Sequence, residues 1–97
     1  MNDAGNPDFA VREVEIVNRL GLHARAAARF VAAANQFSSD IQVSREGRSV
    51  NGKSIMGMMM LAAGQGSWIR IEAEGTDAAS ALDTLEQLVA ERFGEDT

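Results

Sequence analysis

The feature of this sequence that most constrains its fold is the order in which its apolar residues change their spacing. Segments in which every second residue is apolar, the period of a half-buried strand, alternate with segments in which apolar residues return every three or four positions, the period of a one-sided helix. The expected strands cover residues 11–17, 40–46, 49–52 and 67–75, and the expected helices cover residues 23–37, 53–66 and 76–94. The predicted order is therefore β-α-β-β-α-β-α, with a hairpin in the middle.

The last helix shows why a sheet is required. Its sequence, TDAASALDTLEQLVAERFG, places apolar side chains on one side only, at Ala78, Ala81, Leu82, Leu85, Leu88 and Val89. Such a stripe has to be covered by another element. A Thr or Asp side chain is expected to cap the start of this helix. We predict an α+β fold in which the helices pack on one face of a single sheet.

The first helix has the same one-sided character. The residues expected to face the core are Ala27, Phe30, Val31 and Ala34. In the preceding strand, Val14 and Ile16 fall on one face, as the period of two requires. The strand after the second helix repeats this alternation.

Length and composition narrow the class of protein. Ninety-seven residues with 45% apolar content suit one domain. We expect it to cover residues 11–97, after a loose polar lead-in over residues 1–10. The net charge of −5 argues against a nucleic-acid partner. Without cysteine and with one histidine, the chain lacks the ligands of a usual zinc or thiolate centre, so neither a metal nor another cofactor is expected.

No apolar window approaches the roughly 20 residues that a membrane-spanning helix needs. The N-terminus also lacks the basic and apolar regions of a signal peptide. We therefore expect a cytoplasmic protein without membrane insertion.

The only histidine, His23, lies in the stretch NRLGLHARAAARF, between a glycine turn and the first helix. It is expected at or beside the N-cap, where unpaired N–H groups and the positive end of the helix dipole favour an anion. Arg25 adds a guanidinium suited to phosphate oxygens, and Arg29 lies one turn further on. Neutral imidazole is a nucleophile near pH 7, so these residues suit a histidine that accepts a phosphoryl group covalently. An ordinary turn at Gly21 and a solvated arginine face would explain every residue here except the histidine.

A second unusual stretch is SIMGMMML, residues 54–61. On a helix, one arc holds Ile55, Met56 and Met59, and another holds Met58, Leu61 and Ala62. One short helix on one sheet cannot bury both arcs, so we predict that the first arc is an exposed docking face. Ser54 is expected to be the N-cap. Its phosphorylation would add about −1.5 to −2 charge beside that face without melting the helix.

Two blocks of the sequence resemble a known family. GLHARAAARFV, residues 21–31, is similar to the active-site signature of the HPr family, the histidine-containing phosphocarriers of the bacterial phosphoenolpyruvate-dependent phosphotransferase system. NGKSIMGMMMLAAGQGSWIRIEAEG, residues 51–75, resembles the serine-site motif of the family and the strand after it. With the final helix, the resemblance extends from Val11 to Phe93.

The resemblance implies an HPr-like open-faced β-sandwich, in which a four-stranded antiparallel sheet is covered on one face by three helices. It implies that Enzyme I phosphorylates His23, in the family through Nδ1, and that the group passes to a downstream EIIA-type acceptor. Arg25 matches the phosphate-steadying arginine of the family, and Ser54 matches the serine that an HPr serine kinase phosphorylates in some lineages. Such a protein is a stoichiometric carrier and not a turnover enzyme.

We expect docking of these partners at Ala28, Arg29, Ile55, Met56 and Met59. A basic patch of Arg25, Arg29 and Lys53 is expected to meet acidic surfaces on donor and acceptor.

The sequence departs from the family pattern at Ala26, where proline is common, and the loss of a proline at the first turn is expected to loosen the site slightly. Leu20 and the RLGLHAR segment are more like the nitrogen-related branch, whereas the Ser54 motif points the other way. Whether the protein serves sugar uptake (the carbon branch) or nitrogen-related regulation therefore stays open. Two other functions also stay open: a regulatory interaction module acting through its docking face or phosphorylation state, and a small-molecule-sensing domain using the glycine-rich loop at residues 64–68.

Overall fold

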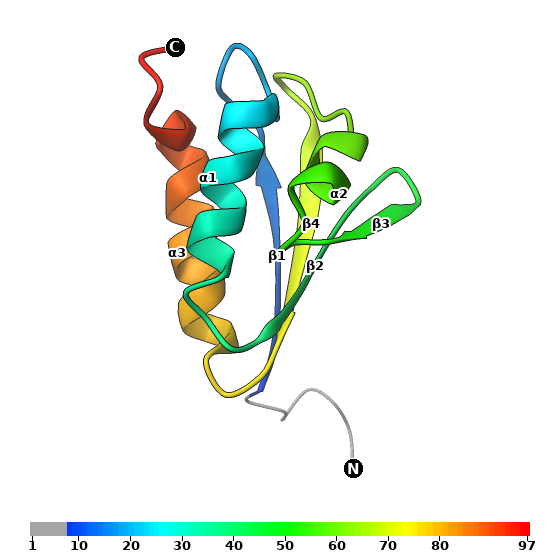
Figure 1. Cartoon of the computed structure of the whole chain (residues 1–97), viewed down its shortest axis with the longest axis vertical. Helices are drawn as coiled ribbons and strands as arrows, with labels where there is room; N and C mark the ends of the chain where they lie inside the picture. The colour runs from blue at the N-terminus through cyan, green and yellow to red at the C-terminus, as the bar shows by residue number, and fades with distance from the viewer. Residues whose placement is uncertain (1–7) are drawn as a thin grey trace.

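The computed structural model describes residues 8–97, which form one sheet and three α-helices (Figure 1). The elements are β1 (Phe9–Glu15), α1 (Ala24–Ala34), β2 (Asp40–Arg45), β3 (Arg48–Asn51), α2 (Ile55–Met60), β4 (Trp68–Glu74) and α3 (Ala78–Ala90). A short 3₁₀ turn at Arg92–Gly94 follows α3. Phe9 and Ala10, which were expected in the lead-in, belong to β1 because they pair with Glu74 and Ala73 of β4. The rest of the expected lead-in, residues 1–7, lies outside the described residues.

The sheet has the strand order β1-β4-β2-β3, and every neighbouring pair is antiparallel. The hairpin of β2 and β3 was predicted from the turn at residues 46–48, and it is confirmed. β4 lies in the middle and pairs with the first strand on one side and with β2 on the other. The antiparallel sheet of the predicted α+β fold is confirmed.

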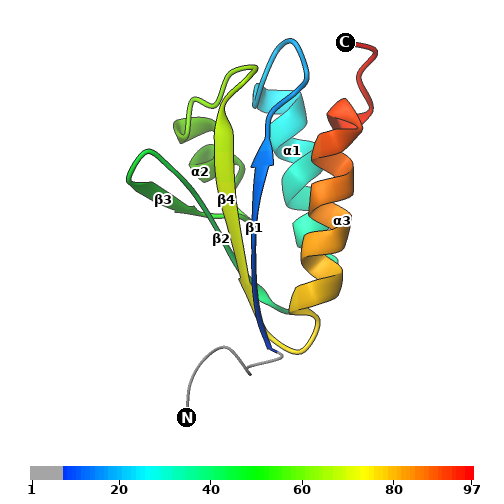
Figure 2. The ribbon, with the colours of Figure 1, turned by 180° about the vertical axis from the view of Figure 1, so that it is seen from behind.

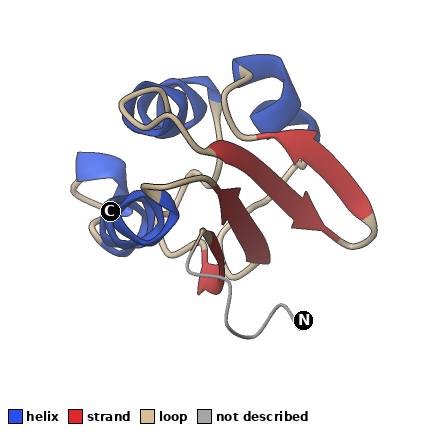
Figure 3. Ribbon diagram, turned by 90° about the horizontal axis from the view of Figure 1, so that it is seen from below, coloured by secondary structure: helices blue, strands red, loops and turns tan. Residues whose placement is uncertain are grey.

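The helices lie on one face of this sheet, as the view from behind and the view from below both show (Figures 2 and 3). α1 and α3 run side by side, and α2 packs between α1 and the hairpin strand β3. The sheet contributes alternate residues to the core, and the residues of its inner face are Val14, Ile16, Ile41, Val43, Ile69, Ile71 and Ala73. α1 and α3 cover them with the residues predicted for their apolar sides, among which only Leu88 is partly buried.

The second helix is shorter than predicted. It ends at Met60, and Leu61 is its C-cap, so the glycines at positions 64 and 66 lie in the following connection and do not close it. Ala62 has a φ of 51° and is exposed, although it was expected in the buried arc with Met58 and Leu61. The reason is that Ala62 lies beyond the last helical turn, where the spacing of a helix no longer sets its direction.

The cap of the last helix also differs from the expectation. Asp77 occupies the N-cap position of α3, but its side chain makes no capping hydrogen bond. The carboxylate accepts hydrogen bonds from the backbone N–H groups of Ser38 and Ser39, at 2.9 and 3.0 Å, and from the hydroxyl groups of both serines. It therefore links the α1–β2 connection to the β4–α3 connection and does not cap α3.

Candidate functional site

His23 is the N-cap residue of α1, as the sequence predicted. Its backbone is extended, with φ −73° and ψ 177°, and its carbonyl accepts from the N–H of Ala27 at 2.9 Å. The imidazole makes no capping hydrogen bond, and 29% of the side chain is exposed. The ring therefore lies at the solvent boundary, beside the N–H groups and the positive dipole end of a helix of 11 residues.

The loop before His23 is held by its contact with the connection between α2 and β4. The N–H of Leu22 donates to the carbonyl of Ala63 at 2.9 Å. Gly21 has a φ of +66°, and a Cβ at this position would lie 2.6 Å from the same carbonyl oxygen. Only glycine can adopt this positive φ and also leave room for the Ala63 carbonyl, so Gly21 is required for this contact as well as for the turn.

Arg25 lies in the first turn of α1 and is exposed. Its side chain makes no ion pair or hydrogen bond with any residue of the described range 8–97. Together with His23 it lines a shallow surface hollow whose other walls are Leu20, Ala24, Glu95 and Thr97. A guanidinium without a protein partner beside a helix N-terminus is available to an anion.

Glu95 is the acidic partner of His23, and sequence reasoning missed it. Its Oε2 lies 2.5 Å from Nε2 of His23, and its Oε1 accepts from Nδ2 of Asn18 at 3.0 Å. Burial opposes the charged form, but the hydrogen bonds from Asn18 and His23, with the nearby charges of His23 and Arg29, hold the pKa of Glu95 below its ordinary value. Glu95 is therefore ionised at neutral pH.

Arg29 has a structural partner that the docking prediction did not include. Its Nη1 donates to the backbone carbonyl of Phe93, just beyond the end of α3. The guanidinium therefore fixes the chain that leads to Glu95, while the residue as a whole stays exposed. Its neighbour Ala28 is partly buried. The basic patch is smaller than predicted, because Lys53 donates to the carbonyl of Phe37, beyond the opposite end of α1 from His23.

Ser54 is the N-cap of α2, and its hydroxyl accepts from the N–H of Gly57 at 3.0 Å, as predicted. The two arcs predicted around α2 also separate, apart from Ala62, which was expected in the buried arc and is exposed. Met58 and Leu61 are buried, with 0% and 3% exposure, whereas Met56 is 74% exposed. Ile55 and Met59 are each 43% exposed, so the first arc forms an open apolar surface.

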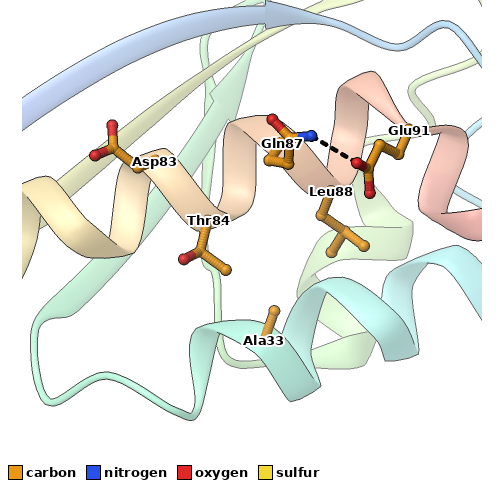
Figure 4. A pocket seen from close by; sticks show the side chains of 6 residues that line it. All are labelled: Ala33, Asp83, Thr84, Gln87, Leu88 and Glu91. Atoms are coloured by element: carbon orange, nitrogen blue, oxygen red, sulfur yellow. Dashed lines mark hydrogen bonds between the residues drawn. The ribbon is translucent and has the colours of Figure 1, made fainter.

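Other parts of the surface offer less chemistry. A groove between α1 and α3 is lined by Ala33, Asp83, Thr84, Gln87, Leu88 and Glu91 (Figure 4). Two of its polar side chains, Gln87 and Glu91, bond to each other at 2.5 Å. Across the described range no cluster of three metal-ligating side chains occurs, and none of the helices described there is long and apolar enough to cross a membrane.

The glycine-rich loop at residues 64–68 forms a backbone turn. The N–H groups of Gly66 and Ser67 donate to the carbonyls of Ile16 and Gly64, at 2.7 and 3.0 Å. Those two amides are therefore occupied and cannot cradle a ligand phosphate. The surface hollow that this loop lines together with Arg45 and Glu46 therefore lacks these two amides as donors for a small anionic ligand.

Comparisons with known proteins agree with the resemblance. The family model described as "PTS HPr component phosphorylation site" matches residues 10–91. "Phosphocarrier protein HPr" of Cupriavidus necator is 52% identical over 84 residues, which cover 87% of this chain and 94% of that protein. The same-named protein of Neisseria meningitidis is 49% identical with the same coverage. A crystal structure of HPr from Thermoanaerobacter tengcongensis superposes with a TM-score of 0.87 at 44% identity, covering 91% of this chain and 99% of that one.

Proposed function

We propose, from the premise that this chain belongs to the HPr family and is a phosphocarrier of the phosphotransferase system, that His23 is the residue that carries the phosphoryl group. The observation that supports this assignment is the position of the ring. It is partly exposed at the N-cap of α1, and Nδ1 has no hydrogen-bond partner among residues 8–97. A nucleophilic nitrogen is thus available at the end of a helix that favours negative charge.

Arg25 is proposed to steady the transferred group. Its guanidinium has no partner in the described part of the chain, and Arg25 lines the same hollow as His23. A planar guanidinium can hold two phosphate oxygens at once while leaving phosphorus open to attack. This arrangement keeps the phosphoryl group bound but transferable.

The proposed donor is phosphorylated Enzyme I, and the proposed acceptor is a downstream protein of the EIIA type. Both would dock on the exposed arc of α2 and on the neighbouring surface of α1, and these docking residues are Ala28, Arg29, Ile55, Met56 and Met59. Apolar contacts would supply most of the affinity, and Arg25 with Arg29 would orient acidic partner surfaces. Such encounters are transient and weaken as salt is added. We propose that these encounters take place in the cytoplasm.

Ser54 is proposed as a regulatory site for an ATP-dependent serine kinase. Its hydroxyl lies at the start of α2, the helix that carries the docking residues Ile55, Met56 and Met59. A phosphate there would be tolerated by the helix N-terminus but would place negative charge beside the apolar docking face. We therefore expect Ser54→Asp to keep the circular dichroism spectrum and to slow phosphoryl transfer. An unchanged transfer rate would count against this switch.

The test of the proposed site is mass spectrometry after incubation with phosphoenolpyruvate and active Enzyme I. The expected product is one acid-labile phosphoryl group on a peptide that contains His23, and its absence from the His23→Ala variant. Circular dichroism should show that this variant remains folded. A phosphoryl group that persists in His23→Ala, or wild-type protein that accepts none, would overturn the assignment. No feature of the site favours the alternative of a regulatory module without phosphoryl transfer.

A further inference from the structure

The C-terminal segment from Arg92 to Thr97 folds back over the site, and we propose that Glu95 in this segment is a positioning residue for phosphoryl transfer. Glu95 keeps the proton of His23 on Nε2 throughout the cycle. As a result, Nδ1 receives the phosphoryl group. When the group later passes to the acceptor, the His23 ring is left as neutral imidazole. This inference rests on the proposed role of His23 as the phosphorylated residue.

The backbone turns toward His23 at a place where turning is unfavourable. Arg92 and Phe93 have φ angles of 60° and 55°, a region that residues with a side chain rarely adopt, and Gly94 follows with 82°. The ring of Phe93 is 1% exposed, so burial in the core holds the turn in place. Beyond Glu95, the carbonyl of Thr97 accepts from the N–H of Arg19 at 2.6 Å. The segment is therefore fixed on both sides of Glu95, beside the loop that leads into α1 (Figure 2).

Asn18 sets the orientation of the Glu95 carboxylate. Its side chain is completely buried, and Nδ2 donates both to the carbonyl of Gly21, at 2.9 Å, and to Oε1 of Glu95, at 3.0 Å. Turning the amide over would bring Oδ1 against two oxygen acceptors, so this orientation is the only satisfactory one. Oδ1 itself has no partner in the part of the chain that the structure describes. A buried amide is thus committed to holding the carboxylate.

The second carboxylate oxygen determines the tautomer of His23. An ionised carboxylate can only accept hydrogen bonds, so at 2.5 Å the Nε2 of His23 must be the donor. The neutral ring then carries its proton on Nε2 and its free electron pair on Nδ1. The Glu95 side chain is only 15% exposed, so water competes little for this contact.

This placement of the proton serves both halves of the cycle. In uptake, the electron pair of Nδ1 forms a bond to phosphorus while the bond from phosphorus to the donor breaks, and the ring becomes a phosphoimidazolium with its proton facing Glu95. In release, the acceptor nucleophile bonds to phosphorus, the Nδ1–P bond breaks, and its electron pair returns to Nδ1. The leaving group is neutral imidazole because the proton has stayed on Nε2. Loss of that proton would make the leaving group an imidazolate, which departs far less readily.

The test compares Glu95→Ala with Asp96→Ala, which removes the same charge from the next residue, an exposed one. Long-range ¹H–¹⁵N NMR at mildly alkaline pH reports the tautomer directly. Wild-type protein and Asp96→Ala are expected to show only the form with the proton on Nε2. Glu95→Ala should populate both tautomers, and its two ring-nitrogen signals should move toward each other. Dispersed amide spectra would establish that all three proteins are folded.

Transfer rates provide the second readout. Losing a hydrogen bond to a charged group is expected to lower the transfer rate roughly tenfold. Glu95→Ala should therefore slow both uptake from phosphorylated Enzyme I and release to the acceptor by that factor. Glu95→Gln keeps an acceptor oxygen but loses the charge, so its transfer rates should lie between those of Glu95→Ala and the wild type. Unchanged tautomer and unchanged rates in Glu95→Ala would overturn the inference. If the wild-type protein accepted no phosphoryl group on His23, the proposed function itself would fail, and the tautomer measurement would not depend on that result.

Discussion

Gly21, two positions before His23, is the residue at which a single added methyl group would disturb the site most directly. A Cβ there would lie 2.6 Å from the carbonyl oxygen of Ala63 and 2.8 Å from Cα of Gly64, and both are backbone atoms that cannot swing aside. The φ of +66° adds a conformational cost for any residue other than glycine. The loop before His23 thus packs directly against the α2–β4 connection, with no room for a side chain at position 21.

We therefore expect Gly21→Ala to lower the free energy of unfolding by about 3 kcal/mol, from the left-handed backbone and the steric clash together. Urea unfolding followed by circular dichroism measures this loss. Gly47→Ala is the matched control, because Gly47 also has a positive φ, of +84°, but nothing lies within 4 Å of an added Cβ. Its expected loss is only about 1 to 2 kcal/mol. Equal losses in the two variants would show that the contact with Ala63 is not tight.

At the scale of helices and strands, periodic burial was predictable from the sequence and local boundaries were not. The apolar stripe of α3 and the alternation in β4 were found correctly because each element buries one face along its whole length. The end of α2 was missed because the left-handed backbone at Ala62 carries no glycine signal. His23 and Ser54 could be placed at helix starts, since capping depends on neighbouring residues. Glu95 could not be placed at the site, because it is 72 residues from His23 and its contact depends on the folded chain.

The two arcs of α2 make separate contributions, which two methionines can distinguish. Met58 is fully buried, and Met58→Ala is expected to lower the free energy of unfolding by about 2 to 4 kcal/mol through the cavity it leaves. Met56 is 74% exposed, so Met56→Ala should change stability by less than about 0.5 kcal/mol. At a temperature where both variants are folded, Met56→Ala should raise the KM for transfer from Enzyme I, and Met58→Ala should not. The prediction fails if Met56→Ala transfers with the wild-type KM.

In the whole molecule, the proposed phosphoryl site at His23 and the Asp77 carboxylate, which links two connections of the chain, lie at opposite ends. The C-terminal segment and the loop before α1 meet at one end, and the α1–β2 and β4–α3 connections meet at the other (Figure 1). Asp77 joins those two connections through its bonds to Ser38 and Ser39. Its loss should therefore reduce stability without disturbing the chemistry at His23. This separation allows stability and transfer to be tested independently in one variant.

Acid unfolding is the measurement that isolates this link. The hydroxyl of Ser39 and the N–H of Ser38, the two largest of the hydrogen-bond contributions, lower the pKa of Asp77 from 3.8 to about 2. A carboxyl group whose pKa is lower in the folded protein stabilises the fold above its ordinary pKa, and this contribution disappears as the pH falls from about 4 to about 2.

We expect the unfolding free energy of the wild-type protein to fall across that interval, and Asp77→Asn to be less stable at pH 7 but to lose less on acidification. Glu95, whose pKa is also lowered, should leave a residual slope in the variant. Denaturant titrations at successive pH values, with phosphoryl transfer measured at pH 7, provide both readouts. Parallel pH profiles for the two proteins, or slower transfer by folded Asp77→Asn, would contradict the separation of the two ends.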